Sequence, residues 1–446
     1  MDFSESLSTT TAVAATRAYV AHAVEYRLCV RDAGTLGVVQ LFSCLDRVVS
    51  VDFSPDGTMV MARLVPSRSM VQVFKVDEPD WTAKVDEGAA GIANAIWTPD
   101  SRGIITFAEF GVRLSAWNLS NKAVTHIHAP KLLTARGVTF SPQGNLMALA
   151  ERCDTKDFIT VFRTSDWEPA AHFPVATTDL QCIQWSPDGA AIAVADHVLD
   201  YKLLVYAPDG KLLADYKAYE DGLGIRTMAW SPSGQMLAVG SYDGVCRVLN
   251  HVTWKAFAEW SHATEEEGSG GQSVLREPDG VVVYRETSTP EAEGGVAYVV
   301  DELPVGVDTV KPQMDKPNPK LGVCAIGFSS DGAYCFTRNE HMPCALWIWD
   351  MKTLELASLL IQRSPITSAS WDAAQTRLLL TTAPVNAPDA PRAVYMWTPD
   401  GCSCIPVPNA GLVPGSVAWN PNAAEEASFV LTDAAAQHFA CGFCAA

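Results

Sequence analysis

The chain has 446 residues, 48% of them hydrophobic, and its 51 acidic residues outnumber its 32 basic residues, which gives a formal net charge of −19. Because binding to a phosphate backbone requires clustered Lys and Arg, this balance argues against a nucleic-acid surface. No apolar run approaches the ~20 residues that span a bilayer, and residues 1–17 lack the pattern of a signal peptide, so we expect a cytoplasmic protein that does not enter a membrane.

An aromatic residue followed by a turn of the type S-P-x-G recurs along the chain. Pro presets φ and Gly supplies a positive φ, so each copy predicts a tight turn between two strands. The aromatic positions are Phe53, Trp97, Phe140, Trp185, Trp230, Phe328, Trp371 and Trp419. They lie 43 to 48 residues apart except for one interval of 98 residues. We expect these side chains to pack in a core.

A second landmark follows about twenty residues after most of these turns. It is a short apolar strand ending in a large side chain, at residues 71–74, 114–117, 159–162, 203–206, 346–349 and 394–397. In the clearest copy, residues 219–255, Asp243 is expected to cap the turn before the third strand. Each copy reads as a four-stranded antiparallel meander. Two landmarks in fixed order at this period predict an all-β WD40 propeller.

A degraded first copy fills residues 8–45, where RLCVRD at 27–32 is the third strand. The total is then about nine blades in a single closed ring, with seven blades plus extra units as the alternative. We expect blades 1–6 within residues 1–260 and blades 7–9 within 320–446. The last copy lacks a fourth strand, which residues 1–7 are expected to supply, because an unpaired sheet edge is a liability.

Residues 261–319 account for the irregular interval. They contain 12 acidic residues against 4 basic ones, six prolines and the run EEEGSGG. This composition predicts a flexible acidic insertion, either a solvated linker or a partner-binding loop. Within it, residues 281–284 and 296–300 could be strands that dock on a blade edge.

Sequence signatures of catalysis were not found. The chain has no phosphate-binding loop, no H-E-x-x-H and no G-x-S-x-G, so we expect neither an enzyme nor a bound cofactor. His126 and His128 alternate along one strand without an evident third metal ligand. The C-x-C at 402–404 and the C-x-x-C at 441–444 lack a second pair, so we interpret the cysteines as structural thiols and expect no metal.

The turns between second and third strands should share one face of a propeller, where loops bind protein partners. The candidate partner-binding residues on these turns are Glu151, Arg152, Asp154, Lys156, Asp157, Asp196, His197, Tyr201, Tyr242, Asn339 and His341. Arg152 and Lys156 could meet acidic residues of a partner. The alternative is a solvated hairpin whose charges pair locally.

The stretch at 199–255, from LDYKLLVYAPDGKLLADYK to NHVTWK, resembles the WD-repeat family of spindle-pole and centrosome anchoring proteins. Further matching pieces are RLCVRD (27–32), EPDW (78–81), KVDEG (84–88), MALAERCDTKDF (147–158), SDW (165–167) and NPKLGV (318–323). The first repeat and the middle of the insertion depart from the family pattern.

The resemblance implies a non-catalytic scaffold that binds a coiled-coil centrosomal adaptor. The complex would hold microtubule minus ends or satellite material at the centrosome, spindle pole or basal body. The alternative is a propeller of a translation-initiation or other ribonucleoprotein complex, against which the acidic balance counts.

Overall fold

The computed structural model describes residues 2–444 except 12, 66–68, 129, 263–264, 267–271, 277–279, 290–294, 313–319, 384–391, 409–411, 421–427, 434 and 436. These residues form strands joined by turns, with 3₁₀ segments at Gly88–Ala90, Glu109–Gly111 and Ala135–Gly137. Over the described ranges, no helix has the length and apolar character needed to cross a membrane.

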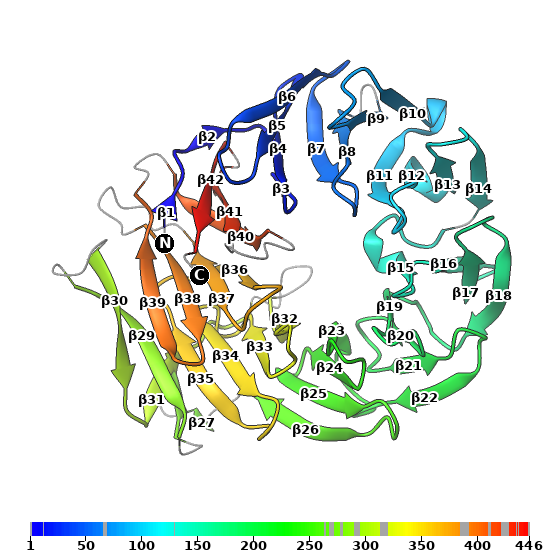
Figure 1. The fold of residues 1–446 in the computed structure, drawn as a ribbon. Coiled ribbons are helices and arrows are strands. Elements are labelled where there is room, and N and C mark those ends of the chain that lie inside the picture. The colour runs from blue at the N-terminus through cyan, green and yellow to red at the C-terminus, as the bar shows by residue number, and fades with distance from the viewer. Residues whose placement is uncertain are drawn as a thin grey trace. The chain divides into compact units, whose positions relative to one another are not determined.

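The chain divides into two compact units, of which unit 2 comprises Ser8–His197 and Lys202–Ala218. It holds five four-stranded antiparallel sheets, here called blades 1 to 5 (Figure 1). Blade 1 is β3 (Ala14–Ala15), β4 (Tyr19–Val24), β5 (Arg27–Asp32) and β6 (Val38–Ser43); blade 2 is β7 (Val48–Phe53), β8 (Met59–Leu64), β9 (Met70–Lys75) and β10 (Thr82–Asp86). Blade 3 is β11 (Ile92–Trp97), β12 (Gly103–Ala108), β13 (Arg113–Asn118) and β14 (Val124–His128). Blade 4 is β15 (Val138–Phe140), β16 (Leu146–Cys153), β17 (Lys156–Arg163) and β18 (Pro169–Val175); blade 5 is β19 (Cys182–Trp185), β20 (Ile192–Ala195), β21 (Leu203–Tyr206) and β22 (Leu212–Tyr216).

Unit 1 comprises Met1–Leu7, Val198–Tyr201 and Tyr219–Ala446, and holds blades 6 to 9. Blade 6 is β23 (Ile225–Trp230), β24 (Met236–Ser241), β25 (Val245–Asn250) and β26 (Ala256–Ser261); blade 7 is β32 (Val323–Phe328), β33 (Tyr334–Asn339), β34 (Ala345–Asp350) and β35 (Leu356–Ile361). Blade 8 is β36 (Ile366–Trp371), β37 (Leu378–Thr382), β38 (Ala393–Thr398) and β39 (Gly401–Pro406); blade 9 is β40 (Pro414–Trp419), β41 (Ser428–Asp433) and β42 (His438–Phe443) with the N-terminal β1 (Asp2–Phe3). A further short strand is β2 (Leu7–Ser8). The described residues thus build nine blades, which confirms the larger of the two predicted numbers.

The recurring turns use the glycine as expected and add a cap by Ser and Asp side chains. In the first of them the Ser54 hydroxyl donates to Asp56 at 2.6 Å and accepts from the backbone N–H of Met59 at 2.9 Å, while Gly57 takes a φ of 73°. Asp243 caps its own turn in the same way, because it accepts from the Ser241 hydroxyl at 2.5 Å and from the Val245 N–H at 3.0 Å. The structural role expected for Asp243 is confirmed.

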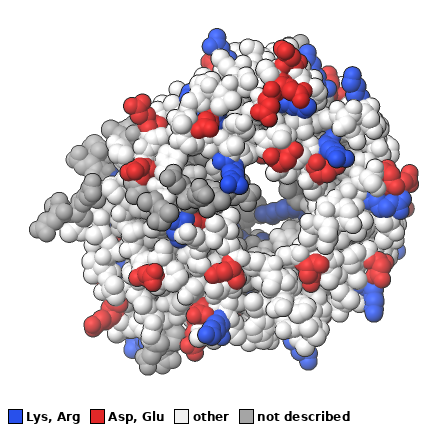
Figure 2. All heavy atoms as spheres, in the orientation of Figure 1, with Lys and Arg blue, Asp and Glu red and all other residues white. Residues whose placement is uncertain are grey.

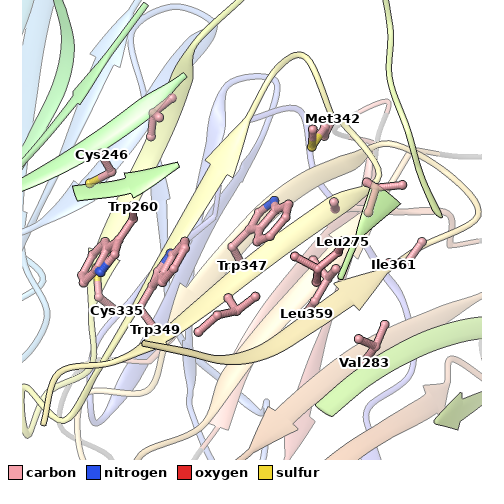
Figure 3. Close-up of a cluster of buried hydrophobic side chains, with 14 of the residues drawn as sticks. Cys246, Trp260, Leu275, Val283, Cys335, Met342, Trp347, Trp349, Leu359 and Ile361 are labelled. Atoms are coloured by element: carbon pink, nitrogen blue, oxygen red, sulfur yellow. The ribbon is translucent and has the colours of Figure 1, made fainter. Parts of the chain in front are cut away.

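The aromatic residues of the turn motif divide into two groups. Phe53, Trp97, Trp185 and Trp419 are buried, whereas Phe140, Trp230, Phe328 and Trp371 are half-buried. The prediction that all eight lie within a core is therefore wrong for Trp230, whose ring packs edge-on against Trp254 at 6.0 Å. In the same unit Trp347 and Trp349, on the third strand of blade 7, belong to one buried hydrophobic cluster with Trp260 (Figure 3).

The segment between blades 6 and 7 contains five strands: β27 (Glu265–Glu266), β28 (Gln272–Leu275), β29 (Val282–Ser288), β30 (Val296–Asp301) and β31 (Val305–Asp308). β28 pairs with β27 and β31, and the hairpin of β29 and β30 adds to blade 7 because β29 pairs in parallel with β35. Docking of two strands on a blade edge, one of the readings of the sequence, is confirmed.

The reading of this segment as a solvated linker is wrong for its described strands. Leu275, Val283, Val305 and Val307 are buried in the same cluster as Trp347. These side chains make the segment part of the core of unit 1. Their burial stabilises the unit, since each Å² of apolar surface removed from water contributes about 25 cal/mol. The run at 267–271 lies outside the described residues.

The N-terminal strand supplies the missing edge of blade 9. β1 pairs with β42 so that Phe3 lies opposite Gly442, and the Phe3 ring packs edge-on against Phe429 at 5.9 Å. A Cβ on Gly442 would come within 2.2 Å of the Phe429 ring, so only glycine fits there. The predicted completion of the last blade is confirmed.

Deleting residues 1–7 should lower the thermal midpoint and promote aggregation, because it leaves one edge of β42 unpaired and uncovers Phe429. Removing residues 265–271 is the control, since that deletion leaves β42 paired. Melting followed by circular dichroism and light scattering would measure both. Equal stability of the two deletions would contradict a structural role for β1.

Candidate functional site

The predicted partner-binding turns come together as two separate groups, one in each unit. In unit 2, the hairpin from Glu151 to Asp157 meets Asp196 through Asp179, whose N–H donates to the Asp196 carboxylate at 2.9 Å. In unit 1, Tyr242, Asn339 and His341 line one hollow.

The group in unit 2 consists largely of charges that pair with one another. The Asp157 carboxylate is buried, and it accepts from Lys131 at 2.7 Å and from the Leu180 N–H at 2.7 Å. Arg152 donates to Asp179 and lies 3.6 Å from Asp157. The hairpin therefore fits the alternative in which its charges pair locally.

Three of the predicted contact residues in this group are not available to a partner. Glu151, Asp157 and Asp196 are 9%, 1% and 1% exposed, because each carboxylate accepts hydrogen bonds from its own unit. Glu151 accepts from the Thr160 hydroxyl at 2.5 Å, and Asp196 accepts from the Thr178 N–H at 2.9 Å. The expectation that these three residues contact a partner directly is wrong. Arg152, Asp154 and Lys156 are exposed, and His197 is half-buried.

The group in unit 1 has a different chemistry, because aromatic and guanidinium groups predominate. Tyr201 and Tyr219 lie with ring centroids 4.7 Å apart, and the Arg247 guanidinium lies 5.6 Å from the centroid of each ring. Arg247 also pairs with Asp243 at 2.8 Å. Together with Arg226 and Tyr242, these residues form what we call the tyrosine–arginine face. Tyr201 and Arg247 are buried within it, so the expectation that Tyr201 contacts a partner directly is wrong. Tyr219, Arg226 and Tyr242 are half-buried.

Tyr242 is held by contacts on both sides. The Arg226 guanidinium lies 5.4 Å from the centroid of its ring, pairs with Glu340 at 2.8 Å and donates to the Leu321 carbonyl. The φ of Gly322 is 81°, and a Cβ on this residue would come within 2.5 Å of the Tyr242 Cα. The close approach of this glycine and the Arg226 contacts together fix the position of the Tyr242 backbone and ring.

Two hollows flank Tyr242 and Asp243, and both residues line each of them. The first has a volume of about 320 Å³; its other lining residues are Gly244, His262, Ser273, Thr309, Pro312, Leu321, Gly322, Asn339, His341 and Met342. The second has a volume of about 310 Å³ and is also lined by Tyr219, Asp221, Gly222 and Leu223. Volumes near the lower end of the range for ligand pockets suit single side chains of a partner better than a large cofactor.

A buried histidine lies in the wall of the first hollow. The Trp349 indole N–H donates to the Thr337 hydroxyl at 2.7 Å, and this hydroxyl lies 2.7 Å from His262 Nε2. His262 Nδ1 lies 2.6 Å from the Gly244 carbonyl. Because a carbonyl can only accept, Nδ1 carries the proton and Nε2 accepts from Thr337. Burial lowers the pKa of His262 to about 4, so the ring is neutral at pH 7.

Sequence reasoning missed His262, Tyr219, Arg226 and Arg247. Tyr219, Arg226 and Arg247 lie within the clearest repeat, at 219–255, but a strand pattern does not show which side chains of neighbouring turns stack. The one signal in the sequence that could have indicated His262 is its position directly after β26, the fourth strand of blade 6. From there it reaches Thr337 on the second strand of blade 7, and Thr337 in turn contacts Trp349 on the third strand.

The charge of the tyrosine–arginine face is negative. Its turns at 198–201, 219–226, 241–247 and 339–342 carry five carboxylates and two guanidinium groups. Both arginines already pair with carboxylates of the face, whereas Glu220 and Asp221 are exposed. Leu199, which is 68% exposed, adds an apolar side chain to the same turns.

On the side of the molecule drawn in Figure 2, acidic and basic side chains are interspersed. Among the described residues, no group of three or more His, Cys, Asp and Glu is arranged to hold a metal ion. Cys441 and Cys444 are both buried, and burial raises the pKa of the Cys441 thiol to about 12.

Comparison with known proteins identifies the family. The WD domain, G-beta repeat model matches residues 210–250. The chain is 39% identical over 415 residues to the mouse WD repeat-containing protein WRAP73, an alignment that covers 89% of this chain and 86% of that protein. An uncharacterized WD repeat-containing protein of Schizosaccharomyces pombe is 21% identical over 82% of this chain and 76% of its own length.

Among solved structures, the C-terminal WD40 domain of Sif2 is similar in fold. Its TM-score is 0.51 at 12% identity, and the match covers 91% of this chain and 99% of that domain. Such a low identity speaks for the fold alone, whereas the longer alignment with the mouse protein extends over most of both sequences. This chain belongs to the family of WD-repeat proteins that includes mouse WRAP73.

Proposed function

We propose that this protein is a non-catalytic WD-repeat scaffold that binds a coiled-coil centrosomal adaptor through its tyrosine–arginine face. The complex would hold microtubule minus ends or satellite material at the centrosome, spindle pole or basal body. Protein partners are what propeller loops of this kind commonly bind.

The proposal rests on the position of two sequence pieces that resemble the anchoring family, because both contribute residues to the tyrosine–arginine face. The stretch at 199–255, which closely resembles the spindle-pole anchoring family, contains Tyr201, Tyr219, Arg226, Tyr242 and Arg247. A second resembling piece, NPKLGV at 318–323, contributes Leu321 and Gly322, which line the first hollow. Two of the family-resembling pieces thus supply side chains of the tyrosine–arginine face, whereas others, such as MALAERCDTKDF at 147–158, lie in unit 2.

Composition also supports a face for proteins. Tyr and Arg are enriched among the residues that contribute most binding energy in protein interfaces. Here the Tyr and Arg side chains already contact one another, so little conformational entropy is lost when a partner binds.

Co-precipitation from cells that carry the tagged protein at its own locus would test the function. We expect the coiled-coil adaptor and other pole components among the bound proteins, and no enrichment in the ribosomal fraction of a sucrose gradient. Sedimentation with ribosomes, without pole components in the precipitate, would favour the alternative of a ribonucleoprotein propeller.

A further inference from the structure

The two hollows beside Tyr242 differ in the side chain that each can accept. The first is walled by Met342, Leu321 and Pro312, and its histidine is neutral and already hydrogen-bonded. These groups suit a large apolar side chain, because they offer apolar contact area without an unpaired charge.

The second hollow suits a basic side chain. Its lining residues include two acidic residues, Asp221 and Asp243, and two tyrosines, Tyr219 and Tyr242. A Lys or Arg side chain placed there would lie among acidic and tyrosine side chains. Asp243 is already paired with Arg247, so the exposed Asp221 is the carboxylate that attracts an incoming cation.

The two hollows are neighbours, because Tyr242 and Asp243 belong to the walls of both. Side chains one turn apart on a helix are about 5–6 Å apart at Cβ, so a single helix can place one side chain in each hollow. The hollows are lined mainly by loop residues rather than by the open edge of a strand. This favours docking of a helix over addition of a strand.

We propose that the tyrosine–arginine face recognises a helical segment carrying a large apolar residue and, one turn away, a Lys or Arg. The apolar side chain occupies the first hollow, the basic side chain occupies the second, and Tyr242 lies between them. This inference rests on the proposed function, since it specifies the chemistry of the adaptor helix. The negative charge of the surrounding turns excludes acidic helices and accelerates the encounter with basic ones.

Fluorescence anisotropy with two synthetic helical peptides tests the proposal. Both are alanine-based 20-residue peptides with Leu residues; one carries Arg four residues after each Leu, and the other carries Glu at those positions. The full chain should bind the Leu/Arg peptide at least tenfold more tightly than the Leu/Glu peptide. Affinity for the Leu/Arg peptide should fall when salt is raised from 50 to 300 mM.

Two variants and a control assign the binding to the hollows. Asp221→Lys should abolish or reverse the preference for Arg, and Tyr242→Ala should weaken binding of the Leu/Arg peptide about tenfold or more. Glu355→Lys, an exposed charge reversal in the turn between β34 and β35, should change neither. Circular dichroism would verify that all three variants are folded.

Equal affinity for the two peptides, no binding of either, or an effect of Glu355→Lys as large as that of Asp221→Lys would each overturn the proposal. These results leave the proposed function separately testable. If the adaptor still co-precipitates with the wild-type protein and with Asp221→Lys, the scaffold role stands and the adaptor binds elsewhere.

Discussion

Replacing Trp349 with Ala is expected to lower the free energy of unfolding by about 4 kcal/mol, as is usual when a buried aromatic side chain is removed. Its ring lies beside that of Trp260 (Figure 3), at a centroid distance of 4.9 Å and an interplanar angle of 4°. Its N–H donates to the Thr337 hydroxyl. The substitution would leave a void among Trp260, Trp347 and the strands between blades 6 and 7. Urea denaturation followed by circular dichroism measures this loss.

Trp230→Ala provides the matched control in the same unit. Because Trp230 is only half-buried and contacts Trp254 edge-on, its loss should cost less than half as much as the loss of Trp349. Trp349→Phe should also be milder, since it keeps a stacked ring and gives up mainly one hydrogen bond. If Trp230→Ala destabilised the protein more than Trp349→Ala, the arrangement of the unit 1 core would be wrong.

The second large effect is a loss of stability in mild acid that depends on His262. The pKa of this buried ring is lowered to about 4, whereas a histidine in the unfolded chain titrates near 6.5. The unfolded state therefore binds more protons between these values. The stabilisation is complete above about pH 6.5 and disappears as the pH falls to about 4, and its full size is about 3 kcal/mol.

Urea unfolding midpoints at pH 7.5 and pH 5 would measure this pH-dependent stabilisation. The urea midpoint of the wild type should fall between pH 7.5 and pH 5, and the midpoint of His262→Gln should fall by less. At pH 7.5 the variant should be less stable than the wild type. Part of the acid sensitivity should remain, because burial and the nearby Arg31 also lower the pKa of His22 to about 4. His251→Gln, at a half-exposed position, should behave like wild type. An unchanged pH dependence in His262→Gln would rule out this assignment.

The repeat pattern was sufficient to predict most of the strands, because turn chemistry and alternation are local properties. The S-P-x-G turns, the cap by Asp243 and the nine blades follow from residues that lie close together in the chain. The burial of individual side chains cannot be predicted from such local patterns. Whether Trp230 is covered depends on what the neighbouring turns place beside it, which a single sequence does not reveal.

The candidate site was predictable in part for the same reason. Tyr242, Asn339 and His341 were placed on one face because second turns share an edge, and they do line one hollow. The charged hairpin at 151–157 attracted attention because its residues are ionisable, yet partners from other turns, Lys131 and Asp179, neutralise it. The pairing of Arg226 and Arg247 with tyrosines depends on contacts between turns, so the repeat pattern could not indicate it.

The central claim is that this WD-repeat protein works at a microtubule-organising centre through its tyrosine–arginine face. Fluorescence microscopy of the protein tagged at its own locus, as wild type and as Tyr242→Ala with Asp221→Lys, tests it most directly. We expect the wild type in one or two juxtanuclear or basal-body foci and the double variant dispersed at an equal protein level. A dispersed wild-type protein, or foci that persist unchanged in the folded double variant, would contradict the claim.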